Sequence, residues 1–309
     1  MLNPSPRKPD FFILGAAKSG TTSLYAYLAQ HPEIFMSPVK EPSFFCDVFQ
    51  VVDNPIDYLA LFQDATNQKR IGEASHVYLT CPKTAPVLRA FFPDARFLLI
   101  LRNPVDRAYS LYHHMAGAGH EWLPSFEEAL QREESRACDP VFEKKNPQYF
   151  YNYLYFRSGL YGEQIERYLQ WFERDRFLFL TLDELLADQM NTIQRIWRFL
   201  DVDSSVVPIL EVHNKGSGVR SPSWQYFLCQ RLRPAVAWLS APLSTAAGSW
   251  LRAWVRQEVP IPPMQPRTRK LLQARYAADL LQTEKLTGLD LSAWMSRTES
   301  LPEVDRAAA

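Results

Sequence analysis

Two glycines that flank a lysine form the first stretch of the sequence whose residues suggest chemistry. Gly15 and Gly20 stand on either side of Lys18, and three hydroxyl residues follow at 21–23. The apolar run before this stretch predicts a buried strand, and the apolar spacing after it predicts a helix. A loop between a strand and a helix N-terminus presents backbone N–H groups and the positive end of the helix dipole. The stretch therefore predicts a binding loop for a phosphate-like anion.

The same loop differs from the nucleotide-binding Walker motif in two respects. That motif places a lysine directly after its second glycine, where this chain has Thr21. An NTPase also needs an aspartate after a later strand to hold Mg²⁺. The best later strand, 96–101, is followed by Arg102 instead. The sequence therefore disfavours a P-loop kinase-like phosphotransferase, which stays open as an alternative, and predicts no metal at this loop.

A second basic motif follows the strand expected at 96–101. Asn103 can cap a helix, and Pro104 suits the first helical position, so a helix should begin where Arg102 leaves the strand. Ser110 lies about two turns along that helix. The planar fork of an arginine donates two parallel hydrogen bonds to a phosphate. We therefore expect Arg102 and Ser110 to approach one anionic group.

Together the motifs at 17–22 and 102–110 resemble those of the PAPS-dependent sulfotransferases, and more closely those of the bacterial and heparan-sulfate-type carbohydrate branch. The similarity extends more loosely over 11–294. It implies a sulfotransferase that moves a sulfuryl group from 3′-phosphoadenylyl sulfate (PAPS) to an acceptor hydroxyl, leaving PAP. The acceptor would be a carbohydrate or another small-molecule or lipid alcohol, and the transfer would be in line and metal-independent. A non-catalytic nucleotide-binding protein is the remaining alternative.

The resemblance also implies which residues bind the donor. Lys18 is expected to meet the negative charge that develops on the leaving phosphate oxygen. A late glycine-rich basic loop resembles the family segment that closes over the 3′-phosphate and adenine. The implied donor-binding residues are Lys18, Ser19, Gly20, Thr21, Thr22 and Ser23 for the phosphosulfate end, Arg102 and Ser110 for the 3′-phosphate, and Lys215, Gly216 and Arg220 in the late loop.

The acceptor side is predicted from the segment 70–78, a short strand that runs into a turn. It resembles the family's Glu-x-[Ser/Thr]-x-x-Tyr element, which implies that Glu73 is the general base on the acceptor hydroxyl. Ala74 stands where relatives usually carry a lysine, and His76 stands where they often carry a proline, so His76 is a rival base. An ion-paired structural carboxylate is the alternative interpretation of Glu73.

Two further segments have both a functional and a structural interpretation. Lys40 lies in a stretch that resembles Lys-Glu-Pro-x-Phe-Phe, which implies a catalytic cation near the transferring group, whereas an exposed loop lysine would have no such role. The aromatic residues at 148–156 have two interpretations: they form a wall of the acceptor site, or they pack at the edge of the core.

Composition limits the functional classes. The 309 residues carry 34 Lys+Arg and 34 Asp+Glu, and this balance argues against an extended nucleic-acid surface. Four cysteines stand far apart without a CxxC pair, which is typical of reduced thiols. The first residues contain no apolar signal region, and no run reaches the length of a membrane span. We therefore expect a bacterial-type cytoplasmic enzyme.

The order of expected elements predicts the fold. Strands alternate with helices, which indicates a single α/β, P-loop-like domain over 1–309 with a central parallel sheet flanked by helices and a helical C-terminal part. The ordered core is expected at 10–295. A Trp-rich segment within 224–260 predicts a helical cover or an interface. Its part 224–254 could support a homodimer or peripheral membrane contact.

Overall fold

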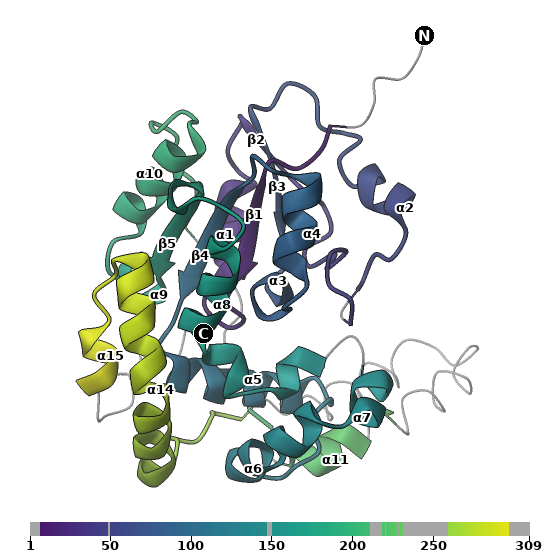
Figure 1. Ribbon diagram of the computed structural model, residues 1–309, viewed down its shortest axis with the longest axis vertical. Coiled ribbons are helices and arrows are strands. Elements are labelled where there is room, and N and C mark those ends of the chain that lie inside the picture. Colours follow the sequence, from purple (N-terminus) through teal and green to yellow (C-terminus); the bar gives the residue numbers. More distant parts are fainter. Residues whose placement is uncertain are drawn as a thin grey trace.

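A five-stranded parallel sheet forms the centre of the protein (Figure 1). The structure is a computed structural model and describes residues 7–48, 50–146, 150–210, 218–219, 221–227, 229–230 and 259–296. The strand order is β2-β3-β1-β4-β5, and each paired neighbour runs parallel. The strands are β1 (Phe11–Gly15), β2 (Ile34–Met36), β3 (Arg70–Ala74), β4 (Arg96–Leu101) and β5 (Phe177–Thr181). The predicted α/β class with a central parallel sheet is confirmed.

The strands are apolar almost throughout because both faces of the sheet are covered by helices. Along β1 the side chains alternate between the two sides, so that Phe12 packs in one core and Ile13 in the other. Three helices cover the Ile13 face, namely α1 (Thr21–Leu28), α9 (Leu182–Ala187) and α10 (Gln189–Leu200). The Phe12 face packs against α3 (Val77–Thr80), α4 (Thr84–Phe91), α5 (Pro104–Gly117), α8 (Tyr161–Leu169) and α14 (Pro266–Thr287).

The carboxyl edge of the sheet faces a second group of helices. Figure 1 shows α5, α6 (Phe126–Ala137), α7 (Pro140–Lys145) and α11 (Pro222–Phe227) beyond the arrowheads of the strands. The chain moves from β1 to β3 on one side and reaches β4 on the other, so the strand order reverses at β1. In parallel α/β sheets, ligands bind outside the carboxyl ends of the strands at such a switch point. The predicted phosphate loop follows β1 at this position.

The helical C-terminal part closes the structure against α8 and α5. The carboxylate of Asp279 on α14 accepts hydrogen bonds from the N–H groups of Gly162 and Glu163 at 3.1 Å, at the N-terminus of α8. Arg269 forms a buried ion pair with Asp106 of α5 at 2.7 Å. Trp294 of α15 (Ser292–Ser296) packs into the same core. These contacts join the last described residues to the helix that follows Arg102.

Two details differ from, or fall outside, the sequence-based expectation. The strand β2 was not predicted, although Ile34-Phe35-Met36 is an apolar triplet directly before the Lys40 segment. The short helix α2 (Pro55–Ala60) follows that segment in the chain. Most of the predicted helical cover at 224–260 lies outside the described residues. Among the helices of the described residues, none is both long and apolar enough to span a membrane.

Candidate active site

The loop after β1 has the backbone shape that an anion cradle requires. Lys18 has a φ of 63° and Gly20 a φ of 90°, so the loop turns twice through the left-handed region before α1 begins. A Cβ added at Gly20 would lie 3.0 Å from the Leu182 side chain, so a glycine fits both the angle and the space. Leu24 donates the first helical hydrogen bond to the carbonyl of Gly20. The N–H groups that precede Leu24 therefore point out of the helix start, toward the loop.

Three cations gather at this loop from separate segments. Arg102 donates from Nη1 to the carbonyl oxygen of Lys18 at 3.2 Å, which brings the end of β4 to the loop after β1. Burial, the positive charge of Arg102 and that of Lys40 together lower the pKa of Lys18 to about 8. Burial is the largest cause of this shift, and the two further cations near Lys18 add to it. The cluster Lys18–Arg102–Lys40 is therefore suited to bind a multiply charged anion.

The start of α5 holds Arg102 in position. The Asn103 side chain accepts a hydrogen bond from the N–H of Val105 at 3.0 Å, and Pro104 is the first helical residue, as predicted. The hydroxyl of Tyr161 donates to the carbonyl of Arg102 at 2.9 Å. Ser110 is buried two turns along the same helix, with 8% of its surface exposed. Arg102 thus lies at the start of α5 next to the phosphate loop, and Ser110 lies two turns further along that helix.

The acceptor side contains a carboxylate–histidine pair that the sequence did not reveal. Glu41 has a φ of 63°, and its Oε2 accepts from the backbone N–H of His76 at 2.8 Å and contacts His76 Nδ1 at 2.7 Å. The other oxygen of Glu41 contacts the Lys40 ammonium group. Burial alone would raise the pKa of Glu41, but His76 and Lys40 lower it to about 2. Glu41 is thus an ionised, partly exposed carboxylate beside the cation cluster.

Glu73, the residue expected to act as base, occupies a different environment. Its side chain is wholly buried: Oε2 accepts from the Tyr58 hydroxyl at 2.5 Å, and Oε1 accepts from the Ser75 hydroxyl at 2.7 Å. Burial raises the pKa of Glu73 to about 7, although the hydrogen bonds from Tyr58, Ser75 and Tyr78 act in the opposite direction. Neither oxygen faces solvent in this arrangement. The role of Glu73 as base therefore stays a prediction, and its contacts are those of a structural carboxylate.

The contacts of Glu73 extend to the loop that carries Glu41. Ser75 accepts a hydrogen bond from the backbone N–H of Ser43 at 3.0 Å while it donates to Glu73. The ring of Tyr58 stacks on Phe44 with the ring centroids 4.5 Å apart. A change at Glu73 would therefore reach the 41–45 loop through Ser75 and Tyr58, without any direct contact with a ligand.

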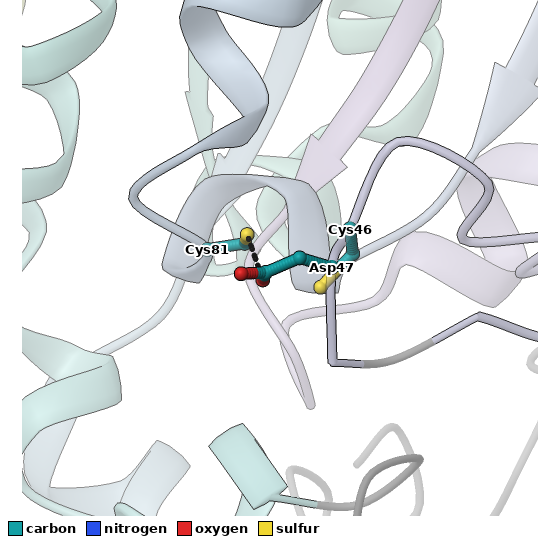
Figure 2. A group of neighbouring side chains, drawn as sticks. All are labelled: Cys46, Asp47 and Cys81. Atoms are coloured by element: carbon teal, nitrogen blue, oxygen red, sulfur yellow. Dashed lines mark hydrogen bonds between the residues drawn. The ribbon is translucent and has the colours of Figure 1, made fainter.

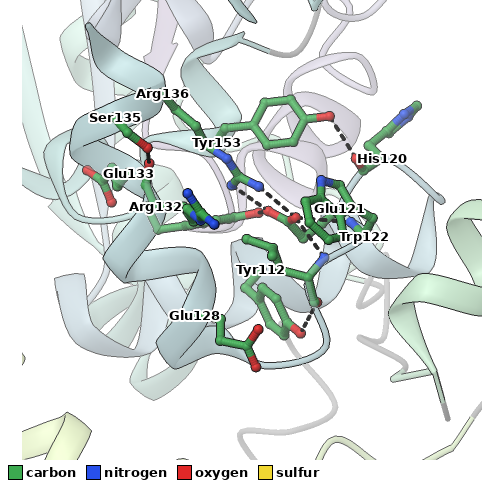
Figure 3. A network of polar contacts seen from close by, with 12 residues as sticks. Tyr112, His120, Glu121, Trp122, Glu128, Arg132, Glu133, Ser135, Arg136 and Tyr153 are labelled. Carbon is green, nitrogen blue, oxygen red and sulfur yellow. Dashed lines mark hydrogen bonds and ion pairs between the residues drawn. The ribbon is translucent and has the colours of Figure 1, made fainter. Parts of the chain in front are cut away.

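A buried ion pair fixes the segment that approaches His76 from the other side. The guanidinium of Arg136 donates to both oxygens of Glu121, at 2.6 and 2.8 Å, and Figure 3 shows this pair beside Tyr153. Tyr155 donates to Glu121 at 2.8 Å, so the aromatic run is joined to the same pair. Directly before Tyr153 in the chain, Asn152 brings its Oδ1 within 3.3 Å of His76 Nε2.

This network places part of the aromatic run in the core. Tyr153 and Tyr155 are buried and hydrogen-bonded to protein groups. Tyr151 and Phe156 are half-buried and line a cavity, so an acceptor wall stays a prediction for them. The run also brings Asn152 to His76. His114 on α5 is a second missed residue: desolvation by the surrounding protein, and after it the nearby Lys18 and His76, lower its pKa to about 3. No short sequence motif identifies Asn152 or His114 as a site residue.

The predicted site residues divide into three groups. Residues of the loop after β1, Lys40, His76 and Arg102 meet at the carboxyl edge of the sheet, with Ser110 on the adjoining helix. Glu73 lies beneath them in the core. Lys215, Gly216 and Arg220 lie outside the described residues.

Comparison with known proteins identifies the family to which this chain is similar. Residues 8–216, more than half of the chain, match the family model of the sulfotransferase domain. The crystal structure of a sulfotransferase from Alicyclobacillus acidocaldarius superposes with a TM-score of 0.71 at 30% identity, covering 93% of this chain and 99% of that one.

Curated relatives are similar over parts of their length. Human carbohydrate sulfotransferase 15 is 26% identical over 78% of this chain and 54% of its own length. Human heparan sulfate glucosamine 3-O-sulfotransferase 6 is 26% identical over 63% of this chain and 52% of its own. The chain thus spans about half the length of these two relatives. The family model and the geometry of the loop after β1 lead to the same conclusion: the chain belongs to the sulfotransferase-domain family.

Proposed function

We propose that this sulfotransferase takes the sulfuryl group from PAPS and transfers it to a hydroxyl of a carbohydrate. The observation that carries the proposal is the convergence of Lys18, Arg102 and Lys40 on a glycine-bounded loop at a helix N-terminus. Such a site favours a ligand with several negative charges close together. The carbohydrate acceptor is supported by the names of the relatives, among them a carbohydrate and a heparan sulfate sulfotransferase.

Two parts of the site bind the two ends of the donor. Lys18 and the N–H groups at the start of α1 bind the 5′-phosphosulfate end, together with Ser19, Gly20, Thr21, Thr22 and Ser23. Arg102 and Ser110 bind the 3′-phosphate, because a guanidinium can donate two charge-assisted hydrogen bonds to such a group. The proximity of Arg102 to Lys18 supports one ligand that spans both.

The proton of the acceptor hydroxyl passes to Nε2 of His76, while Glu41 orients the ring through Nδ1. As the acceptor oxygen forms its bond to sulfur, the bond between sulfur and the phosphate oxygen breaks, and Lys18 meets the charge left on that oxygen. Glu41 stays ionised, because His76 and Lys40 lower its pKa to about 2, and so low a pKa makes the carboxylate itself a weak base. Glu73, by contrast, is wholly buried. A base must reach the proton it removes, so exposure favours His76, whose side chain is 18% exposed.

The alternative of a kinase-like phosphotransferase has no support at the end of β4. Residues Arg102 and Asn103 follow this strand, and Asn103 is engaged as the cap of α5. An NTPase of this loop type would hold Mg²⁺ with an acidic residue at that place.

The experiment that tests the proposal measures transfer of radiolabelled sulfate. The full chain is incubated with labelled PAPS and a panel of carbohydrates, lipid alcohols and phenols, with and without Mg²⁺. We expect labelled carbohydrate, formed at the same rate in both conditions. Labelling of phenols alone would refute the carbohydrate acceptor, and phosphate transfer from Mg²⁺–ATP would refute the reaction itself.

A further inference from the structure

Two cysteines and an aspartate that are not joined by any sequence motif converge at the end of the loop at 37–48, the acceptor-side loop. Cys46 and Asp47 lie at the end of that loop, and Cys81 follows α3. Figure 2 shows the two sulfur atoms on either side of the Asp47 carboxylate. One ligand atom from each of the three residues lies within 4.8 Å of the others, and Cys81 Sγ is 3.4 Å from Asp47 Oδ1.

We propose that Cys46, Asp47 and Cys81 bind a thiophilic divalent metal ion of the Zn²⁺ class, as a structural site separate from the sulfuryl-transfer machinery. In a tetrahedral zinc site, metal–sulfur bonds of ~2.3 Å and metal–oxygen bonds of ~2.1 Å place the ligand atoms about 3.6–3.8 Å apart. In the observed cluster the Cys81–Asp47 pair is already this close, at 3.4 Å, and all three ligand atoms lie within 4.8 Å of one another, so a contraction of about 1 Å would complete the site. A tetrahedral ion needs one more ligand, which a water molecule beside the exposed Asp47 can supply.

The surroundings of the cluster match those of a metal site. Lys83 contacts the second oxygen of Asp47 at 2.6 Å, so one carboxylate oxygen is oriented by a neighbour while the other faces the thiols. Outer contacts of this kind orient metal ligands and tune their affinity.

Asp47 is exposed to solvent, and a cavity lies next to the chain neighbours of Cys81. Thr80 and Pro82, the neighbours of Cys81 in the chain, line a cavity of about 450 Å³ together with Tyr151. An ion bound at Cys81 would join the end of α3 to the loop that carries Lys40 and Glu41. Binding therefore stiffens the acceptor side, although it places no metal on the reacting atoms.

Binding is expected to release protons, because the thiol protons leave as the metal–sulfur bonds form. Neither an oxidant nor a reductant is needed. The affinity should consequently rise with pH across the range in which the thiols are still protonated. This pH dependence distinguishes thiolate ligation from nonspecific binding to surface carboxylates, which are already ionised at neutral pH.

The test is a metal titration of the full-length chain after reduction and removal of the reductant. Cd²⁺ and Co²⁺ are added separately, and the thiolate-to-metal charge-transfer band is recorded, with Zn²⁺ used to displace them. We expect one equivalent to saturate the band. The band should be lost in Cys46→Ser and in Cys81→Ser and retained in the control Cys138→Ser, whose thiol is exposed. Lys83→Met should weaken binding by about 10-fold.

Two further measurements keep the outcome decisive. Asp47→Asn, at an exposed position, should fold normally and bind Cd²⁺ more weakly, so a folding defect in the cysteine variants cannot explain all the data. Binding of PAP is measured on the same samples, so that failure of the metal site and failure of the proposed function are seen separately. The proposal is overturned if the reduced chain gives no band, or if the band persists when both Cys46 and Cys81 are replaced by serine.

Discussion

The donor-side loop at 15–23 and the acceptor-side loop at 37–48 lie at the same edge of the sheet but are held by different forces. The donor-side loop is shaped by its own residues: two glycines and a left-handed lysine join β1 directly to α1. The acceptor-side loop is held by residues more than 30 positions away, through Ser43 to Ser75 and Glu41 to His76. A local motif can therefore predict the first loop, whereas the second becomes visible only in the folded chain.

The same contrast separates the two carboxylates of the site. Glu41, beside His76 and Lys40, has its pKa lowered to about 2, whereas burial raises the pKa of Glu73 to about 7. Both acids lie close to residues that the sequence connects with the acceptor. Their surroundings suit them to different tasks, because one stays ionised within reach of solvent and the other is held in the core by hydrogen bonds.

Lys18→Ala should have the largest effect. This lysine lies in the donor-side loop and stabilises the leaving group, so we expect kcat to fall by about 10²–10³-fold while the fold stays intact. Initial rates with PAPS and circular dichroism measure the two quantities. A variant with nearly wild-type kcat would remove Lys18 from the mechanism.

Replacement of the two carboxylates tests the comparison on the acceptor side. Glu41→Gln keeps the shape but removes the carboxylate charge that orients His76, so kcat should fall by about 10²-fold or more with PAP affinity almost unchanged. Glu73→Gln is the matched control and should lower kcat less while it changes thermal stability. If Glu73→Gln abolishes turnover in a stable protein and Glu41→Gln does not, the base must be assigned to Glu73. His76→Ala should resemble Glu41→Gln, since the two residues act as a pair.

The stability of the fold against pH should reveal the raised pKa of Glu73. The folded carboxyl titrates near 7 and the unfolded one near 4.5, so the folded state binds more protons between these values. Stability should therefore fall as pH rises from about 4.5 to 7, by on the order of 2 kcal/mol from this group. Denaturant unfolding of the wild type and of Glu73→Gln at several pH values isolates the contribution. Parallel curves for the two proteins would show that Glu73 does not titrate in this range.

The affinity for PAP should depend on pH through Lys18. Its pKa is lowered to about 8 in the free protein, and a bound anion favours the charged ammonium and raises that pKa. Affinity should be level below pH 8 and fall by up to ~10-fold per pH unit above it. Calorimetry on the wild type and on Lys18→Ala measures this, and the variant should bind more weakly without the fall. An equal fall in both proteins would assign the titration to another group.

The sequence predicted the elements whose causes are local. The buried strand before the loop, the strand at 96–101, the cap at Asn103 and the helical C-terminal part follow from apolar runs and capping residues, and the structure has each of them. The two cation-bearing motifs followed from the same local patterns. The fold class was predicted because strands alternate with helices along the chain.

What could not be predicted depends on contacts between distant segments. Glu41 is an ordinary loop residue in the sequence, and only its hydrogen bond to the His76 ring makes it a candidate member of the catalytic pair. Burial of Glu73 results from the packing of Tyr58 over it, 15 positions away. Cys46 and Cys81 have no motif spacing and meet only because their segments pack together. The expected cytoplasmic location stays a prediction.

The central claim is that the cluster Lys18–Arg102–Lys40 binds a nucleotide that carries both a 3′-phosphate and a 5′-phosphate. The most direct test is calorimetric titration of the wild type with adenosine 3′,5′-bisphosphate and with adenosine 5′-phosphate, each with and without Mg²⁺. We predict at least ~10-fold tighter binding of the bisphosphate, since a charge-assisted contact contributes roughly 1.5–3 kcal/mol. Arg102→Ala should remove most of that difference, and Mg²⁺ should not alter it. Equal affinity of the wild type for both nucleotides would contradict the assignment of the site.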